Sequence, residues 1–342
     1  MKYISFTVPC YNSASYMKKC IDSLLFGGED VEIIIVDDGS TKDNTWEIAK
    51  SYQDLYPTIV KAVHKSNGGH GSGVNLGMAI SEGLYFKVVD SDDWVNIDAY
   101  KTLLDKIKEH HLAQVSPDLY IVNYTYEHVE DNTQFTCRYV KQLPVNEFFG
   151  WKRVKTFRRS AFMMMHALVY KKDKLIASRT ILPENTFYVD NIFTFRPLPF
   201  MKSIYYMDID FYRYFIGRPD QSINIKNFVE RYDQQILVMK RMLSSYRYEE
   251  LMQFDNGLRR YMFHCLAVIL LNTLLFTTAK KSQERKNALT ELWAFMKSFD
   301  LKLYKKLKHR SYSIFVNYLP WSLKKQVLMI GYIIVRDKIK LG

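Results

Sequence analysis

Cysteine is scarce in this chain, and several common motifs are missing. The four cysteines form no CxxC pair, so the sequence indicates neither a zinc site nor a redox dithiol and fits a reducing, cytoplasmic setting. No strand is followed by a GxGxxG turn, which argues against a Rossmann dinucleotide site. The first residues, MKYISFTV, lack a long apolar run and a small-residue cleavage site, so they predict a strand and not a signal peptide.

Acidic residues are also scarce in the C-terminal third, where basic residues outnumber them. Residues 1–220 carry a net charge of −1, whereas residues 221–342 carry +13. A dense run of basic residues occupies 302–310. Such a region suggests an anionic membrane surface or a nucleic acid as partner, although a solvated helix face would look the same in sequence.

Short β-rich segments alternate with helical periodicity over the first 90 residues. The predicted strands are 3–9, 31–36, 59–63 and 85–89, and the predicted helices are near 13–25, 45–52 and 71–82. This order predicts parallel βαβ units in an α/β sandwich. From about residue 226 the pattern is helical, so we expect one domain at 1–225 and a basic helical region at 226–342.

Each predicted strand ends in polar residues. Because the carboxyl ends of parallel strands meet at one edge of a sheet, these residues should converge on a ligand site. The last end is the densest, since Asp90, Asp92 and Asp93 fall within four residues. Carboxylates in this arrangement suit a hard divalent cation, Mn²⁺ or Mg²⁺, bound beside phosphate oxygens. The alternative is a helix N-cap before the predicted helix at Asp98, but a cap needs only one carboxylate.

Four segments in this order resemble the family 2 glycosyltransferases of the bacterial surface-polysaccharide type, whose fold is called GT-A. They are FTVPCYNSASYMKKCIDSLL, IIIVDDGSTKDNT, SNGGHGSGVNLGMA and FKVVDSDDW, and the resemblance covers about residues 3–225. It implies a GT-A αβα sandwich with a mostly parallel central sheet.

The resemblance also implies roles for individual residues. Nucleotide binding is implied for Pro9, Tyr11, Asp38, Asn67, Gly68, Asp90 and Ser91, and metal binding for Asp92. Contact with the diphosphate is implied for His70, Arg218 and Ser222, and contact with the acceptor for Trp94 and His166.

The segment LPENTFYVDNIFTF resembles the acidic motif that precedes a helix in this family. Only the second acid of the motif is kept, because Val189 stands before Asp190. Asp190 is therefore the implied general base, which would take the proton of an attacking sugar hydroxyl. Glu184 is the second candidate. A further departure is Val74, which stands before Asn75 where many relatives carry Arg.

The expected function is inverting transfer of a sugar from a nucleotide donor to a glycan or lipid-linked acceptor, and we expect the donor to be a UDP-sugar. Two rivals remain open: a nucleotidyltransferase acting on sugar phosphates, and a nucleic-acid-binding protein that uses the basic C-terminus. We expect a cytoplasmic protein that docks on the inner face of the membrane, and an oligomer is compatible with the sequence. The uncharged stretch 261–279 is expected to be a buried helix of the C-terminal bundle, with a membrane span as the alternative.

Overall fold

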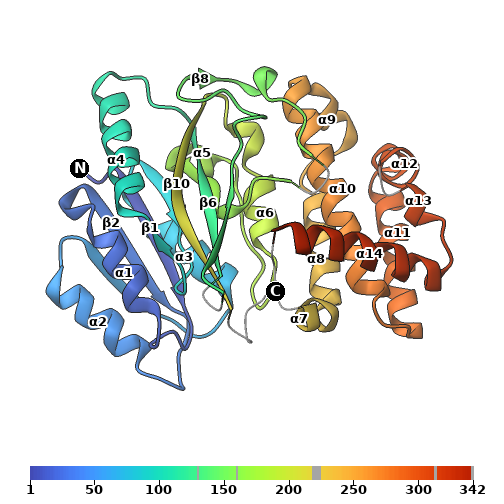
Figure 1. Ribbon diagram of the computed structural model, residues 1–342, viewed down its shortest axis with the longest axis horizontal. Helices are drawn as coiled ribbons and strands as arrows, with labels where there is room; N and C mark the ends of the chain where they lie inside the picture. Colours follow the sequence, from blue (N-terminus) through green and yellow to red (C-terminus); the bar gives the residue numbers. More distant parts are fainter. Residues whose placement is uncertain (129–130, 159–160, 218–224, 312–313, 340–342) are drawn as a thin grey trace. The chain divides into compact units, whose positions relative to one another are not determined.

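The computed structural model describes residues 1–342 except 129–130, 159–160, 218–224, 312–313 and 340–342 (Figure 1). The chain forms two compact units. The first comprises Met1–Arg153 and Met163–Phe215, and the second comprises Val154–Phe162 and Ile216–Gly342.

The first unit is built on one mixed sheet. Its strand order is β3-β2-β1-β4-β9-β6-β10-β5, with β7 paired to β6 and β8 to β10. The pairs among β3, β2, β1 and β4 are parallel. The pairs β4–β9, β9–β6, β6–β7, β10–β5 and β10–β8 are antiparallel. The strands are β1 (Ile4–Cys10), β2 (Val31–Asp37), β3 (Val60–His64), β4 (Tyr85–Val88), β5 (Trp94–Val95), β6 (Leu119–His128), β7 (Thr133–Cys137), β8 (Phe148–Phe149), β9 (Leu168–Lys171) and β10 (Ile204–Ile216).

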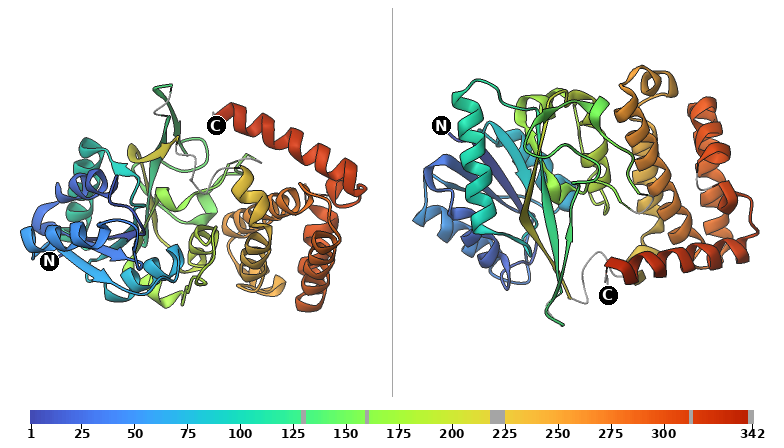
Figure 2. Two further views of the ribbon diagram at one scale, coloured as in Figure 1. Left: turned by 90° about the horizontal axis from the view of Figure 1, so that it is seen from below. Right: turned by 45° about the horizontal axis from the view of Figure 1, so that its top comes forward.

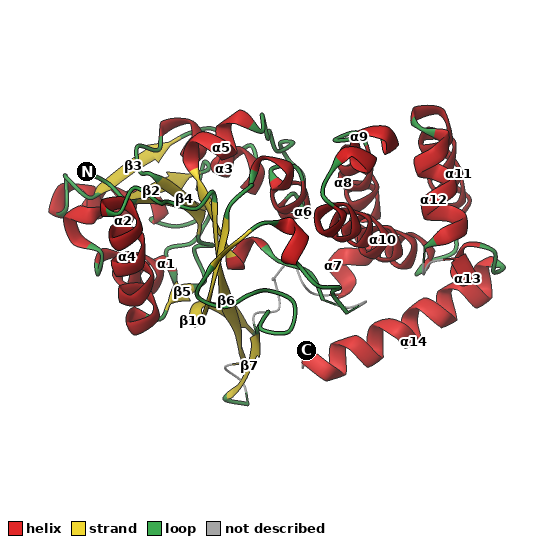
Figure 3. Ribbon diagram, turned by 90° about the horizontal axis from the view of Figure 1, so that it is seen from above, coloured by secondary structure: helices red, strands yellow, loops and turns green. Residues whose placement is uncertain are grey.

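Helices cover both faces of this sheet. Figure 3 shows α1, α2 and α4 on one face and α3 and α5 on the other. The helices are α1 (Met17–Leu25), α2 (Thr45–Leu55), α3 (His70–Ile80), α4 (Ile97–Leu112), α5 (Lys172–Ala177) and α6 (Asp190–Phe195). The predicted α/β sandwich is confirmed, with parallel strands where the sequence alternates strand and helix and antiparallel strands beyond.

Burial explains the sequence pattern of the parallel strands. Every residue of β1 and β2 is buried, because helices cover both sides of the sheet. Continuous apolar runs such as Ile33–Ile35 therefore replace the alternation of a half-exposed strand.

The second unit is helical. Its helices are α7 (Ile225–Glu230), α8 (Tyr232–Leu243), α9 (Tyr248–Gln253), α10 (Asn256–Thr278), α11 (Gln283–Phe299), α12 (Leu301–Arg310), α13 (Ile314–Asn317) and α14 (Trp321–Ile339). The segment 154–162 joins this unit although it lies far away in sequence. Phe157 packs against Tyr261 with ring centroids 4.7 Å apart, and His264 Nε2 lies 2.7 Å from the carbonyl oxygen of Ala161.

Helix α10 is long and apolar and lies within the bundle. It is long and apolar enough to cross a membrane, and 83% of its most apolar window is buried inside the protein. Its threonines are satisfied without water, since Thr273 and Thr277 donate to the carbonyls of Ile269 and Thr273 at 2.7 Å. Such burial and hydrogen bonding are typical of a core helix.

Close packing of α3 on β1 depends on Gly77. A Cβ at this position would lie 2.2 Å from Cγ2 and 2.3 Å from Oγ1 of Thr7, which is fully buried in β1. Alanine normally stabilises a helix relative to glycine, but the overlap here should dominate. We predict that Gly77→Ala lowers the free energy of unfolding by about 2 kcal/mol in urea denaturation.

The matched control is Gly331→Ala in α14, where a Cβ would meet nothing within 4 Å. This change should stabilise its helix by about 0.5–1 kcal/mol. Equal effects of the two substitutions would contradict the packing argument.

Candidate active site

Asp38, which directly follows β2, holds the loop after β3. Its Oδ1 accepts hydrogen bonds from Lys65 Nζ at 2.6 Å and from the backbone N–H of Gly68 at 3.0 Å, while Oδ2 accepts from the N–H of Gly69 at 2.7 Å. Asn67 Nδ2 donates to the Asp38 carbonyl at 2.8 Å. Three residues implied in nucleotide binding, Asp38, Asn67 and Gly68, therefore lie together at the ends of β2 and β3.

Glycine is required in this loop by backbone conformation and by close approach. Gly69 has φ of +80°, and its missing Cβ would lie 3.2 Å from the backbone nitrogen of Asn185. The Asn185 N–H in turn donates to the Gly68 carbonyl at 2.6 Å. The glycines thus let the segment that precedes Asp190 lie directly against the start of α3.

An ion pair joins α3 to the end of β4. His70, the first residue of α3, places Nε2 2.8 Å from Oδ1 of Asp90. Burial opposes ionisation of both groups, but their mutual attraction outweighs it, so the pKa of Asp90 is lowered and that of His70 is raised. The raised pKa of His70 favours its positively charged form at the carboxyl edge of the sheet, where the resemblance implies contact with the diphosphate.

Asp190 faces the same cluster from another element. It is the first residue of α6 and is half-buried. Burial raises the pKa of Asp190 to about 6, the nearby positive charge of His70 opposes this rise, and the charge of Asp90 adds to it. The structure thus brings Asp190, His70 and Asp90 within electrostatic reach of one another, although they are separated by up to 120 positions along the chain.

Asp93 has a different environment from its neighbours in the DSDD segment. It is almost fully buried, and its two oxygens accept from the Tyr212 hydroxyl at 2.6 Å and the Phe215 N–H at 2.8 Å. Burial raises the pKa of Asp93 well above its usual range, as do the charges of Asp92 and Asp90. Asp93 therefore fastens the acidic loop to β10, a role that the sequence did not reveal.

His166 lies beneath the acidic loop. It is buried between the rings of Tyr212 and Tyr214, each with its centroid 4.5 Å away. Burial lowers the pKa of His166 to about 4, so its imidazole is neutral, and its Nδ1 has no hydrogen-bond partner among the residues that the structure describes. The structure places His166 beside the acidic cluster, and the contact with the acceptor that the resemblance implies remains a prediction.

Lys87 on β4 holds the backbone of His166 through a hydrogen bond. This lysine was not predicted as a site residue from the sequence. Its Nζ is fully buried and donates to the carbonyl oxygens of His166 at 2.7 Å and Leu168 at 3.4 Å. Burial lowers the pKa of Lys87 to about 7, while the charge of Asp90 opposes this fall. A basic residue inside an otherwise apolar strand was the available signal.

The cluster has the composition of a divalent metal site. Ligand atoms of Asp90, Asp93 and His166 lie within 4.8 Å of one another. Two aspartates and the neutral imidazole of His166, whose buried Nδ1 has no hydrogen-bond partner within the described part of the chain, form a donor set that fits Mn²⁺ or a similar ion. Asp92, the predicted ligand, is half-buried beside this group, and its part in metal binding remains a prediction.

The other predicted nucleotide-binding residues line the adjacent loop. Pro9 is in β1 and Tyr11 follows it with an exposed side chain. Ser91 is buried, and its Oγ lies 3.0 Å from Oγ of Ser13, which ties the loop after β1 to the acidic loop.

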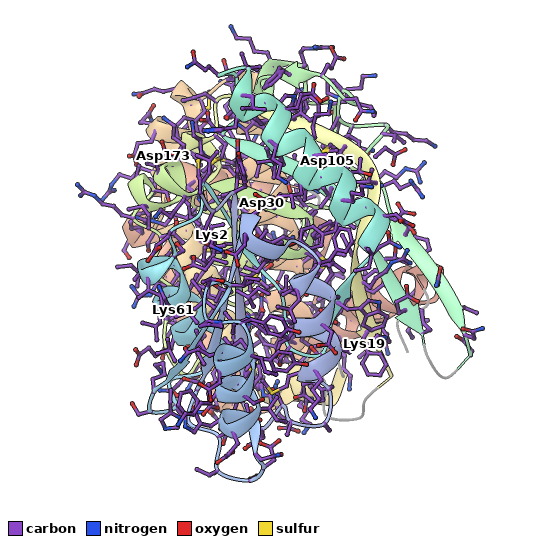
Figure 4. All side chains as sticks on the ribbon, turned by 90° about the vertical axis from the view of Figure 1, so that its left-hand side faces the viewer. Lys2, Lys19, Asp30, Lys61, Asp105 and Asp173 are labelled. Atoms are coloured by element: carbon purple, nitrogen blue, oxygen red, sulfur yellow. The ribbon has the colours of Figure 1, made fainter. Side chains whose placement is uncertain are left out.

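Trp94 lies farther along the acidic segment, in β5. The ammonium of Lys19 is 2.9 Å from its ring centroid, so one ring face is already covered; Figure 4 labels Lys19 on the surface of the first unit. Glu184 is exposed and precedes α6. The predicted diphosphate contacts Arg218 and Ser222 lie outside the described residues.

Comparison with known proteins identifies the class. Residues 5–172 match the glycosyl transferase family 2, and the chain belongs to this family. It is 32% identical over 182 residues to the glycosyltransferase GlyG of Streptococcus pneumoniae serotype 4, which covers 50% of this chain and 57% of GlyG. It is 37% identical over 114 residues to hyaluronan synthase of Pasteurella multocida, which covers 33% of this chain and 12% of that protein. The chain thus spans less than two thirds of these relatives.

Solved structures share the fold. The crystal structure of S. aureus TarS 1–349 has a TM-score of 0.63 at 19% identity, covering 99% of this chain and 91% of that one. A mannosyltransferase of Pyrobaculum calidifontis, solved with GDP-Man and Mn²⁺, has a TM-score of 0.50 at 14% identity, covering 90% of this chain and 88% of that one.

Asn75 secures the segment that leads to Asp190. Its side chain donates to the Leu182 carbonyl at 2.8 Å and accepts from the Leu182 N–H at 3.0 Å. We predict that Asn75→Ala lowers the free energy of unfolding by about 2 kcal/mol, because two backbone groups lose their partner. The measurement is urea denaturation followed by fluorescence.

The control is Gln134→Ala, which removes one exposed hydrogen bond to Glu127. It should change stability by less than about 0.5 kcal/mol. An equal loss from both variants would show that the Asn75 contacts add nothing specific.

Proposed function

We propose that this protein is an inverting glycosyltransferase that moves a sugar from a UDP-sugar to a hydroxyl group of a glycan or lipid-linked acceptor in bacterial surface polysaccharide synthesis. The observation that carries the proposal is the convergence of Asp190 with the His70–Asp90 pair at the carboxyl edge of the sheet. This arrangement supplies a base and a cationic group in one place.

Asp190 acts as the general base. A carboxylate with a pKa near 6 is ionised at neutral pH and is still a better proton acceptor than an ordinary aspartate. It takes the proton of the acceptor hydroxyl as the oxygen forms a bond to the anomeric carbon. The bond from that carbon to the diphosphate breaks on the opposite side, so the configuration inverts and UDP leaves.

His70 stabilises the departing diphosphate. Its imidazolium, held by Asp90, offers positive charge where negative charge develops. A bound Mn²⁺ or Mg²⁺ would supply further neutralisation of that charge, and Asp90 and His166 would hold it together with Asp93 or the predicted ligand Asp92. Asp38, Asn67 and Gly68 shape the neighbouring pocket for the nucleoside.

One observation supports UDP as the nucleotide, and another supports the inner face of the membrane as the site at which the protein acts. TarS, which shares the fold, has been solved with UDP and with UDP-GlcNAc. The basic C-terminal region suits the anionic inner face of the cell membrane, where lipid-linked acceptors are presented. The protein then works in the cytoplasm as a peripheral membrane enzyme.

A nucleotide-release assay tests the proposal. The protein is incubated with UDP-, GDP- and CMP-sugars, with Mn²⁺ and after chelation. We expect UDP release that requires the metal and falls about a hundredfold or more in Asp92→Ala. Release of pyrophosphate in place of UDP would identify a nucleotidyltransferase and overturn the proposal.

The pH dependence tests the role of Asp190. Because its raised pKa leaves it increasingly protonated as the pH falls through about 6, kcat/KM should drop tenfold per pH unit below that value and level off above it. Asp190→Asn should lower kcat by about 10²–10⁴-fold and remove this acid limb.

The comparison variant is Glu184→Gln, six positions earlier and exposed. It should keep most of the activity and the same acid limb. If Glu184→Gln loses activity and Asp190→Asn has little effect, the general base is Glu184 and not Asp190.

A further inference from the structure

The outer side of α13 and α14 exposes large apolar side chains. Phe315 is 82% exposed, Tyr318 60% and Ile330 58%. Leu323, Val327 and Ile330 recur at helical spacing along α14 and lie on one face, whereas Lys324 and Leu328 face inward and are buried. We name Phe315, Tyr318, Leu323, Val327, Ile330 and Ile333 the apolar stripe.

Helix α14 is placed at the edge of its unit. Figure 2 shows it as a long helix that crosses the direction of the neighbouring helices. It contacts α10 and α13. One side of the helix is thus packed. On its other side, Leu323, Val327, Ile330 and Ile333 of the apolar stripe are exposed, whereas Tyr318, which precedes the helix, packs against His309 with ring centroids 5.8 Å apart.

Positive charge surrounds the apolar stripe. Residues 301–342 contain ten Lys and Arg and one acid, Asp337, for a net charge of +9. Lys305 and Lys325 are exposed in this segment. The first unit differs, because basic Lys2 and Lys61 and acidic Asp30, Asp105 and Asp173 are interspersed over the face in Figure 4.

Charge decides whether the apolar stripe binds a second copy of the chain or a lipid bilayer. A second copy of the chain would bring another segment of net charge +9 against the first, and the two would repel. An anionic bilayer attracts the lysines and accepts the apolar side chains at the boundary of headgroups and acyl chains. We infer that α13 and α14 form a membrane-docking surface whose apolar stripe inserts into the interface of an anionic bilayer.

This inference refines the proposed location at the membrane and does not depend on glycosyl transfer. Its test uses the full chain without nucleotide sugar or acceptor. Binding is measured by flotation with vesicles of phosphatidylcholine alone and of phosphatidylcholine mixed with phosphatidylglycerol. We expect binding to the mixed vesicles, weakening with added salt, and about tenfold or more weaker binding to the neutral ones.

The deciding variant carries Leu323→Ser, Val327→Ser and Ile330→Ser. It should bind mixed vesicles about tenfold more weakly than wild type. The matched control carries Leu55→Ser, Leu112→Ser and Ile176→Ser, which remove three exposed aliphatic side chains from the first unit, and it should bind as wild type does.

A second variant keeps the inference testable if the triple-serine variant misfolds. Lys305→Gln with Lys325→Gln changes only exposed side chains and should weaken binding to mixed vesicles several-fold without affecting neutral ones. Equal binding of all variants, equal binding to both vesicle types, or a dimer lost in the Leu323, Val327 and Ile330 variant without vesicle binding would overturn the inference. So would binding of nucleic acid through this surface without vesicle binding. Loss of vesicle binding with UDP release intact would leave the proposed function standing.

Discussion

Repulsion among carboxylates is the constraint on which this site depends. Asp90, Asp92 and Asp93 lie at the end of one strand, and Asp190 faces them from a helix. The repulsion is relieved in a different way at each position. His70 pairs with Asp90. Burial and the neighbouring negative charges favour the protonated form of Asp93. These differences separate the pKa values of groups that begin with the same chemistry, so one carboxylate can hold a cation while another accepts a proton.

The glycine-rich loop makes this arrangement geometrically feasible. Its backbone bonds to Asp38 on one side and to Asn185 on the other, so it fastens the end of β2 to the segment before α6. A side chain at Gly69 would separate these segments. His70 follows directly and gains its position from the same contacts. The conformational freedom of glycine thus allows this loop, the end of β2 and the segment before α6 to lie in contact with one another.

Much of the fold was predictable because the parallel half follows local rules. The run Ile33–Ile35 announces a strand buried on both faces, and polar residues mark its carboxyl end. The convergence of Asp90 with Asp190 was available only through family resemblance, since nothing local links the two. The packing of 154–162 against α10 and the role of Asp93 in fastening β10 could not be predicted, because both depend on contacts between residues about 100 or more positions apart. The burial of His166 could not be predicted either, because sequence does not show how deeply a lone histidine lies in the fold.

The central claim is that this acidic cluster binds a cation and, through it and His70, the diphosphate of a nucleotide. Calorimetric titration of UDP into the protein tests it most directly, in the presence of Mn²⁺ and after chelation, for wild type and His70→Ala. The account predicts that chelation weakens UDP binding by about tenfold or more, and that His70→Ala weakens it further. Unchanged UDP affinity after chelation in both proteins would contradict it.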